Sequence, residues 1–202
     1  MEIIAQGQTN QLRYLVAKFD EDAATLEALV QPVGFGEEVR SEARKVEILG
    51  AQLLLNHLFG HEVQRSHHPD GAPFVEGFDG YVSVSHSKRY IAVAIHPTQP
   101  VGIDIEVNTD RAQRLRERFM KPTELTDAPA SWQMREKALV TWCAKEAAYK
   151  CMPRPAVDFL TDMQVTYDND LLSVTYDRQI VRLMCQITPD WCLVVGGIGL
   201  FS

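Results

Sequence analysis

Two long amphipathic helical patterns, one in each half of the chain, most strongly constrain the fold. In the first, apolar residues recur at intervals of four, three, three and four, at Val39, Ala43, Val46, Leu49 and Leu53. This spacing predicts a helix from about Glu37 to Phe59 with one buried face, which Gly60 can end. The second pattern predicts a helix from about Trp132 to Lys150 and includes the stretch TWCAKEAAYK.

Strand-like segments accompany both helices. GYVSVSHSKRYIAVAI predicts two strands around a polar turn at Ser85 to Lys88, and VGIDIEV predicts another strand. Further strands are expected from Val157 onward, the last of them buried. The fold class is therefore α+β, with two similar α+β halves at 1–99 and 100–202. A cleft between two such halves is a natural place for an active site.

The net charge and the cysteine spacing indicate which classes of protein the chain does not belong to. The chain has 202 residues, and 20 Lys and Arg against 27 Asp and Glu give a net charge of −7. This balance argues against general nucleic-acid binding and against a basic membrane-binding surface. No apolar run approaches the ~20 residues that cross a bilayer, and no secretory signal is expected. The four cysteines lack C-x-x-C spacing, so we expect free thiols and a cytoplasmic protein.

Two carboxylates on one predicted strand are candidate metal ligands. Asp104 and Glu106 are two residues apart in VGIDIEV, so both point to one face of the strand. Like charges this close repel each other unless a cation lies between them, and Mg²⁺ prefers such oxygen ligands. The alternative interpretation is an edge strand with an outward, solvated acidic face.

The second helix adds a third carboxylate and a lysine. Trp142, Glu146 and Lys150 lie four residues apart on one face of the helix. Glu146 could complete a metal site or act as a general base, and Lys150 could bind phosphate or a leaving group. A plain i,i+4 salt bridge beside a buried tryptophan explains the pattern equally well.

Candidate anion-binding residues occur in both halves. Ser85 and His86, in SVSHS, could bind phosphate at a strand end, although His86 also suits an ordinary turn. Arg44 could contact an anion from the first helix, where a solvated face is the commoner meaning. Five basic residues between Arg111 and Lys121 form a cluster that is either solvated surface or a docking site for an acidic partner.

Taken in order, these motifs resemble those of the 4′-phosphopantetheinyl transferases, of the longer type in which two similar halves form a pseudodimer. The strongest matches are VGIDIE (101–106) and WCAKEAAYK (142–150), with SVSHS (83–87) and RFMKPTEL (118–125) in support. Each motif alone is short, and the ordered set is specific.

The resemblance implies transfer of 4′-phosphopantetheine from coenzyme A to a serine of an apo carrier protein, with release of 3′,5′-ADP. It implies that Asp104, Glu106 and Glu146 bind Mg²⁺, that Glu146 is the general base, and that Lys150 contacts phosphate. It also implies that Arg44, Ser85, His86 and Lys150 bind coenzyme A. An acidic acyl or peptidyl carrier protein would dock near the basic cluster from Arg111 to Lys121. A single chain would hold the whole site, so we expect a monomer.

Two positions depart from the family pattern, as does the continuation CMPRPAVDF (151–159) after the third motif. Ala72 stands where the family often has a basic residue that contacts coenzyme A, and Gln52 stands where an arginine is common. These departures favour, as an alternative function, a catalytically impaired module that binds coenzyme A or a carrier protein. A metal-dependent phosphohydrolase or nuclease would use the same three carboxylates, but it fits the acidic charge less well.

Overall fold

Two antiparallel sheets dominate the computed structural model, which describes residues 1–30, 39–152, 156–168 and 171–201. The first sheet has the order β1 (Glu2–Thr9), β2 (Leu12–Lys18), β6 (Tyr90–His96) and β5 (Tyr81–Ser87). The second has the order β7 (Val101–Val107), β11 (Trp191–Ile198), β10 (Gln179–Ile187), β9 (Leu171–Tyr176) and β8 (Met163–Asp168). Strands β3 (Arg65–His67) and β4 (Pro73–Val75) form a separate hairpin.

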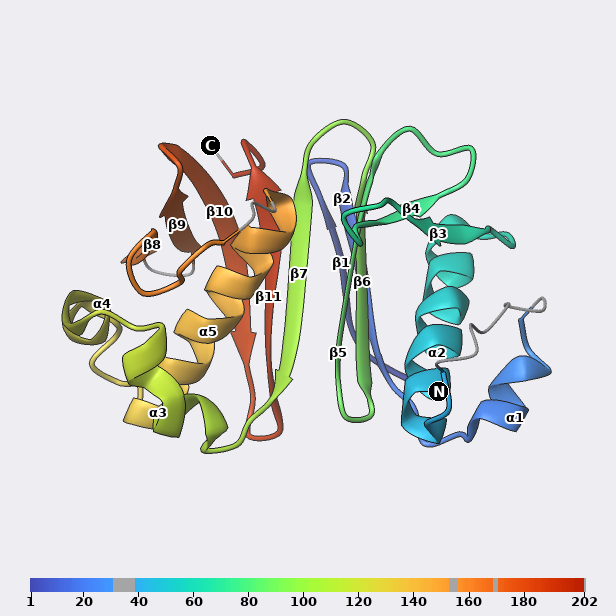
Figure 1. The fold of residues 1–202 in the computed structure, drawn as a ribbon, viewed down its shortest axis with the longest axis horizontal. Helices are drawn as coiled ribbons and strands as arrows, with labels where there is room; N and C mark the ends of the chain where they lie inside the picture. Colours follow the sequence, from blue (N-terminus) through green and yellow to red (C-terminus); the bar gives the residue numbers. More distant parts are fainter. Residues whose placement is uncertain (31–38, 153–155, 169–170, 202) are drawn as a thin grey trace.

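Each large sheet carries one long helix on its outer face, and shorter helices lie around them. The long helices are α2 (Glu42–Phe59) and α5 (Met134–Cys151). The shorter ones are α1 (Ala23–Glu27), α3 (Arg111–Leu115), a 3₁₀ turn (Arg116–Arg118) and α4 (Pro122–Asp127). Figure 1 shows the resulting four layers, in the order α5, five-stranded sheet, four-stranded sheet and α2.

Three apolar clusters fill the spaces between these layers. One lies between α5 and the five-stranded sheet, and another lies between α2 and the four-stranded sheet. The third lies between the two sheets and includes Val16, Ala92, Ile103, Ile105, Leu193 and Val195. In β7, Ile103 and Ile105 therefore point toward the other sheet. Asp104 and Glu106 then face the side that carries α5, as strand alternation requires.

The two sheets meet along β5 and β7 through serine side chains. β7 pairs with β11 on one side. On its other side, the backbone N–H groups of Ile103, Ile105 and Val107 donate to the hydroxyls of Ser83, Ser85 and Ser87, at 3.1, 3.3 and 3.2 Å. The serines thus satisfy donors that an uncovered edge strand would expose.

A glycine allows α5 to lie directly on β7. A Cβ atom at Gly102 would collide with the carbonyl oxygen of Ala147, near the C-terminal end of α5. This close approach brings Glu146 and Lys150 over the strand that carries Asp104 and Glu106, so Gly102 helps to position the candidate site.

The expected α+β fold class is confirmed, with some differences in the elements. The two strands predicted around a polar turn are present, but the turn lies at Lys88 and Arg89 and not from Ser85, because β5 continues to Ser87 and uses this serine to bond β7. The first long helix begins at Glu42, where the Ser41 hydroxyl accepts the Arg44 N–H at 3.0 Å and caps it. Its predicted start, at Glu37, lies outside the described residues. Gly60 ends the helix in a left-handed conformation, as expected.

The strands of the four-stranded sheet all lie before residue 99 and those of the five-stranded sheet after it, while the division into two halves at 1–99 and 100–202 stays a prediction. Their similarity as a pseudodimer stays a prediction. All four cysteines are free thiols. Among the described residues, no helix is both long and apolar enough to cross a membrane.

Candidate functional site

Asp104 lies at the centre of a buried polar cluster. Its side chain is 5% exposed, and its Oδ1 atom accepts hydrogen bonds from the Ser85 hydroxyl at 2.7 Å and from Lys150 Nζ at 2.8 Å. Its Oδ2 atom is buried and has no hydrogen-bond partner among the described residues. A buried carboxylate oxygen with no donor is energetically unfavourable, so this atom is available to a cation or a ligand donor.

Glu146 and Lys150 approach this cluster from α5. Lys150 Nζ also donates to the carbonyl oxygen of Ile103 at 2.9 Å, which ties the last turn of α5 to β7. Burial, together with the nearby charges of Asp104 and Glu106, raises the pKa of Glu146 to about 7. The face of α5 that was predicted to carry Glu146 and Lys150 therefore packs against β7, the strand of Asp104 and Glu106.

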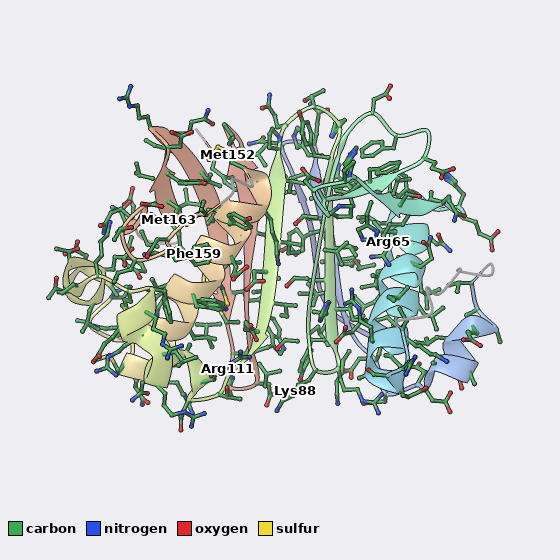
Figure 2. All side chains as sticks on the ribbon, viewed as in Figure 1. Arg65, Lys88, Arg111, Met152, Phe159 and Met163 are labelled. Atoms are coloured by element: carbon green, nitrogen blue, oxygen red, sulfur yellow. The ribbon has the colours of Figure 1, made fainter. Side chains whose placement is uncertain are left out.

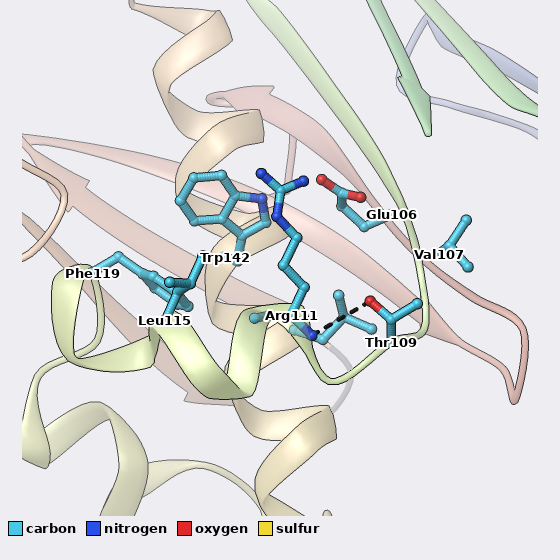
Figure 3. Close-up of a pocket in the computed structure, with 9 residues that line it drawn as sticks. Glu106, Val107, Thr109, Arg111, Leu115, Phe119 and Trp142 are labelled. Carbon is cyan, nitrogen blue, oxygen red and sulfur yellow. Dashed lines mark hydrogen bonds between the residues drawn. The ribbon is translucent and has the colours of Figure 1, made fainter. Parts of the chain in front are cut away.

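Three different side chains lie around the carboxylate of Glu106. Its Oε2 atom accepts the Ser87 hydroxyl at 2.6 Å, and the side chain of Trp142 is a nearby donor that lowers the pKa of Glu106. Burial raises the pKa of Glu106, while the charge of Arg111 acts in the opposite direction. Figure 3 shows the Arg111 guanidinium group between the indole of Trp142 and the Glu106 carboxylate. Trp142 thus contributes an N–H donor to the site in addition to its apolar surface.

The three carboxylates are the kind of ligand that binds a divalent cation, although their side chains do not converge on one point. Among the described residues, no group of three His, Cys, Asp or Glu side chains converges closely enough to hold a metal ion. The unpartnered Oδ2 atom of Asp104 favours a cation here, and so does the repulsion from Asp104 and Glu106, which adds to burial in raising the pKa of Glu146. Oxygen donors of this kind are those that Mg²⁺ prefers.

His86 is held in one orientation by two charged neighbours on α2. Arg44 Nη1 lies 3.0 Å from His86 Nε2, and His86 Nδ1 lies 3.2 Å from Glu47 Oε1. Because arginine only donates, Nε2 accepts and the ring proton lies on Nδ1, which donates to Glu47. Burial lowers the pKa of His86, which favours this neutral form.

A series of pockets that share lining residues extends from Arg44 through His86 to Glu106 and Arg111. One, of about 310 Å³, lies beside Arg44, Arg65 and His86. The next, of about 280 Å³, shares His86 with it and extends over Lys88 to Glu106 and Arg111, so both sheets contribute to its walls. In Figure 2, Lys88 and Arg111 lie at the same end of the two sheets. A third pocket, of about 70 Å³, shares Glu106 and Arg111 and ends at Trp142.

A buried ion pair anchors the helix that carries the site. Lys145 and Glu124 are both 0% exposed, and Lys145 Nζ lies 2.8 Å from Glu124 Oε1. Lys145 also donates to the carbonyl oxygens of Phe119 and Phe159 at 2.6 and 2.8 Å. Lys145 therefore has a structural role, on a face of α5 that packs against Phe119, Glu124 and Phe159.

Comparison with known proteins agrees with the motifs. Residues 100–192 match the sequence profile of the 4′-phosphopantetheinyl transferase superfamily. The chain is also 27% identical over 143 residues to a 4′-phosphopantetheinyl transferase of Bacillus subtilis. That match covers 60% of this chain and 62% of the length of the relative.

The superfamily match contains four of the predicted site residues: Asp104, Glu106, Glu146 and Lys150. The structure brings these four together with Ser85, which lies before the matched region. His86 lines both the pocket beside Glu106 and the pocket beside Arg44, so Arg44 lies one pocket away from the carboxylates. The arginines of the predicted docking cluster are mostly exposed around α3, and Arg111 reaches the pocket beside Glu106.

Sequence reasoning missed several contributors to the site. Glu47 could have been found from its i,i+3 spacing to Arg44 on one helix, and Ser87 from the alternation of serines in SVSHS. No pattern in the sequence around Arg65 indicates that this residue lies near the site. Gln52, which weakened the family resemblance, is buried and donates to Asn56 Oδ1 and the Val63 carbonyl oxygen at 2.9 and 2.6 Å. It therefore stabilises the end of α2 and does not line the pocket beside Arg44.

Proposed function

We propose that this protein transfers 4′-phosphopantetheine from coenzyme A to a serine of an apo acyl or peptidyl carrier protein. The observation that carries this proposal is the superfamily match over residues 100–192, within which Asp104 and Lys150 are in contact and Glu106 and Arg111 line an open pocket. The relative from Bacillus subtilis, which is named as such a transferase, gives further support.

In the proposed reaction, the carrier serine oxygen forms a bond to the β-phosphorus of coenzyme A. The bond from that phosphorus to the bridging oxygen of 3′,5′-ADP breaks, and 3′,5′-ADP leaves with the electron pair. Glu146 is the candidate base for the serine proton, since a carboxyl group with a pKa of about 7 can accept a proton at neutral pH. Lys150 would offer its ammonium group to the phosphate oxygens.

Asp104, Glu106 and Glu146 would hold Mg²⁺, which neutralises pyrophosphate charge when bound. Ser85 would orient Asp104, because its hydroxyl already donates to that carboxylate. Arg44 and His86 would bind coenzyme A from the neighbouring pocket. These roles follow from the family resemblance and from the contacts of each side chain.

The proposed partner is an acidic carrier protein that docks over the exposed arginines around α3. Arg111 lines the pocket beside Glu106, so a carrier docked there would present its serine close to the carboxylates. A monomer in the cytoplasm remains the expected form of the protein.

The deciding experiment measures the intact mass of an apo carrier protein after incubation with this protein, coenzyme A and Mg²⁺. We expect a gain of one phosphopantetheine group, lost when EDTA is added. No gain with several unrelated carrier proteins, using folded protein, would contradict the proposal. That result, with coenzyme A binding retained, would favour the binding module suggested by Ala72. Release of phosphate from simple esters without a carrier would favour a phosphohydrolase.

A further inference from the structure

The pocket beside α2 contains more positive than negative charge. Arg44, Arg65, His67 and His86 line it, and Glu47 is its one acidic residue. Glu47 is already engaged, because its carboxylate lies 3.0 Å from Arg44 Nη1 and 3.2 Å from His86 Nδ1. Arg65 therefore adds a charge that no lining carboxylate balances.

Arg65 projects from β3 beside α2 (Figure 2). Its guanidinium group donates one long hydrogen bond, from Nη2 to the Ile48 carbonyl oxygen at 3.4 Å. Among the described residues, no carboxylate lies within ion-pair distance of it. Burial and the charge of Arg44 lower the pKa of Arg65 to about 10, so the group is still charged at neutral pH.

The same two arginines also act on His67. Burial lowers the pKa of His67, and the charges of Arg65 and Arg44 lower it further. The pocket thus disfavours a third cation, which is the electrostatic condition that favours an anion. A guanidinium group with free N–H donors suits a phosphate group, because it can donate two parallel hydrogen bonds.

We propose that Arg65 binds the ribose 3′-phosphate of coenzyme A and supplies the cation that position 72 lacks. This inference rests on the proposed function. Coenzyme A carries its 3′-phosphate apart from its pyrophosphate, and the pocket of Arg65 joins the pocket of Glu106 through His86. Gly71 and Pro73, which flank Ala72, line the same pocket from the β3–β4 hairpin. Arg65 therefore faces the space that a basic residue at position 72 would border.

The test compares two nucleotides that differ only in the 3′-phosphate, 3′,5′-ADP and 5′-AMP, by isothermal titration calorimetry. We expect the wild-type protein to bind 3′,5′-ADP roughly 10- to 100-fold more tightly than 5′-AMP, as charged hydrogen bonds to one phosphate allow. In Arg65→Gln this preference should fall to within a few-fold of unity. Arg65→Lys should keep part of it, because lysine retains the charge without the planar fork.

The matched control is Arg182→Gln, which removes the same charge from an exposed position on β10 and should leave the preference unchanged. Both nucleotides are measured on one protein sample, so a partly unfolded variant changes both affinities and leaves their ratio intact. In the transfer assay, Arg65→Gln should raise the KM for coenzyme A while kcat is kept.

Two outcomes overturn the inference: a wild-type protein without a preference for 3′,5′-ADP, or an Arg65→Gln variant that keeps the preference. If transfer to a carrier protein is observed in either case, the proposed function stands and only the role of Arg65 fails. If the preference depends on Arg65 but no carrier protein is modified, the anion site stands and the transferase function fails.

Discussion

Lys150 Nζ lies 2.8 Å from Asp104 Oδ1, so the last turn of α5 is joined to the centre of β7 by a charged hydrogen bond. Lys150 leaves the other oxygen of Asp104 without a partner among the described residues. The protein thus holds the Asp104 carboxylate through Oδ1 and leaves Oδ2 available to a ligand. This arrangement suits a residue that must keep its position while it binds a cation.

Replacing Asp104 by asparagine should reduce transfer to a carrier protein roughly 100-fold or more, as loss of a charged group at a reacting centre usually does. The amide keeps the shape but removes the charge from the proposed metal ligand. Intact-mass kinetics with apo carrier protein measure the effect. Asp190→Asn, in an exposed turn, is the control and should retain activity. Wild-type rates in Asp104→Asn would contradict the proposed ligand role.

Glu146 predicts a pH dependence of stability in metal-free buffer. Its carboxyl pKa rises from the ordinary 4.5 to about 7 in the folded protein, chiefly through burial. The folded state therefore holds this proton between these two values, whereas the unfolded chain has lost it. The resulting stability is fully present below pH 4.5 and is lost as pH rises through about 7.

The wild-type protein should therefore lose about 3 kcal/mol more unfolding free energy than Glu146→Gln between these pH values. The glutamine side chain does not titrate, so it removes this contribution while keeping the shape of the residue. Urea denaturation of both proteins at several pH values is the measurement. Parallel pH profiles for the two proteins would show that Glu146 titrates near its ordinary pKa.

We expect alanine substitutions at Ser83 and Ser85 to have similar effects on stability and different effects on kcat. Both hydroxyls accept an N–H of β7, and only that of Ser85 also donates to Asp104. Ser83→Ala and Ser85→Ala should each lower the unfolding free energy by about 1–3 kcal/mol, because each leaves a buried donor unpaired. Ser85→Ala should in addition lower kcat, since Asp104 loses its orienting partner. An equal loss of kcat in both variants would argue against this special role of Ser85.

We expect replacement of Lys145 to lower the unfolding free energy strongly. Lys145→Met leaves the Glu124 carboxylate buried without its cation, which typically costs about 3–5 kcal/mol. Lys137→Met, on the same helix, is the control, because Lys137 makes one long hydrogen bond of 3.4 Å to the Leu125 carbonyl oxygen. Chemical denaturation compares them, and similar losses in the two variants would show that the buried pair has no special importance.

At Gly102, we expect a larger side chain to destabilise the protein through steric contact and not through backbone conformation. Gly102→Ala should lower the unfolding free energy by about 1–3 kcal/mol or more, because its Cβ atom forces α5 away from β7. It should also reduce transfer, since α5 carries Glu146 and Lys150. Gly60→Ala is the comparison: it meets no atom nearby and should cost only about 1 kcal/mol for its left-handed backbone. Thermal unfolding of both variants tests this order.

Short-range periodicity explains which parts of the site the sequence could predict. Asp104 and Glu106 share a face because strands repeat every two residues, and Glu146 and Lys150 share one because helices repeat near every four. Arg65 could not be found in this way, because it reaches Arg44 only through the packing of a short hairpin against α2. The extent of β5 was misjudged for a similar reason: the polar letters of SVSHS suggest a turn, while their partners lie on β7.

The serines of β5 also determine the register of β7 against the four-stranded sheet. Three hydroxyls at two-residue spacing meet three N–H groups at the same spacing. A slip of two residues would leave one hydroxyl and one N–H without a counterpart and would move Glu106 or Asp104 to the wrong serine. A slip of one residue would turn both carboxylates into the apolar space between the sheets. The alignment that pairs every group is therefore the one that assembles the carboxylates, so correct docking of the two sheets and formation of the site are a single event.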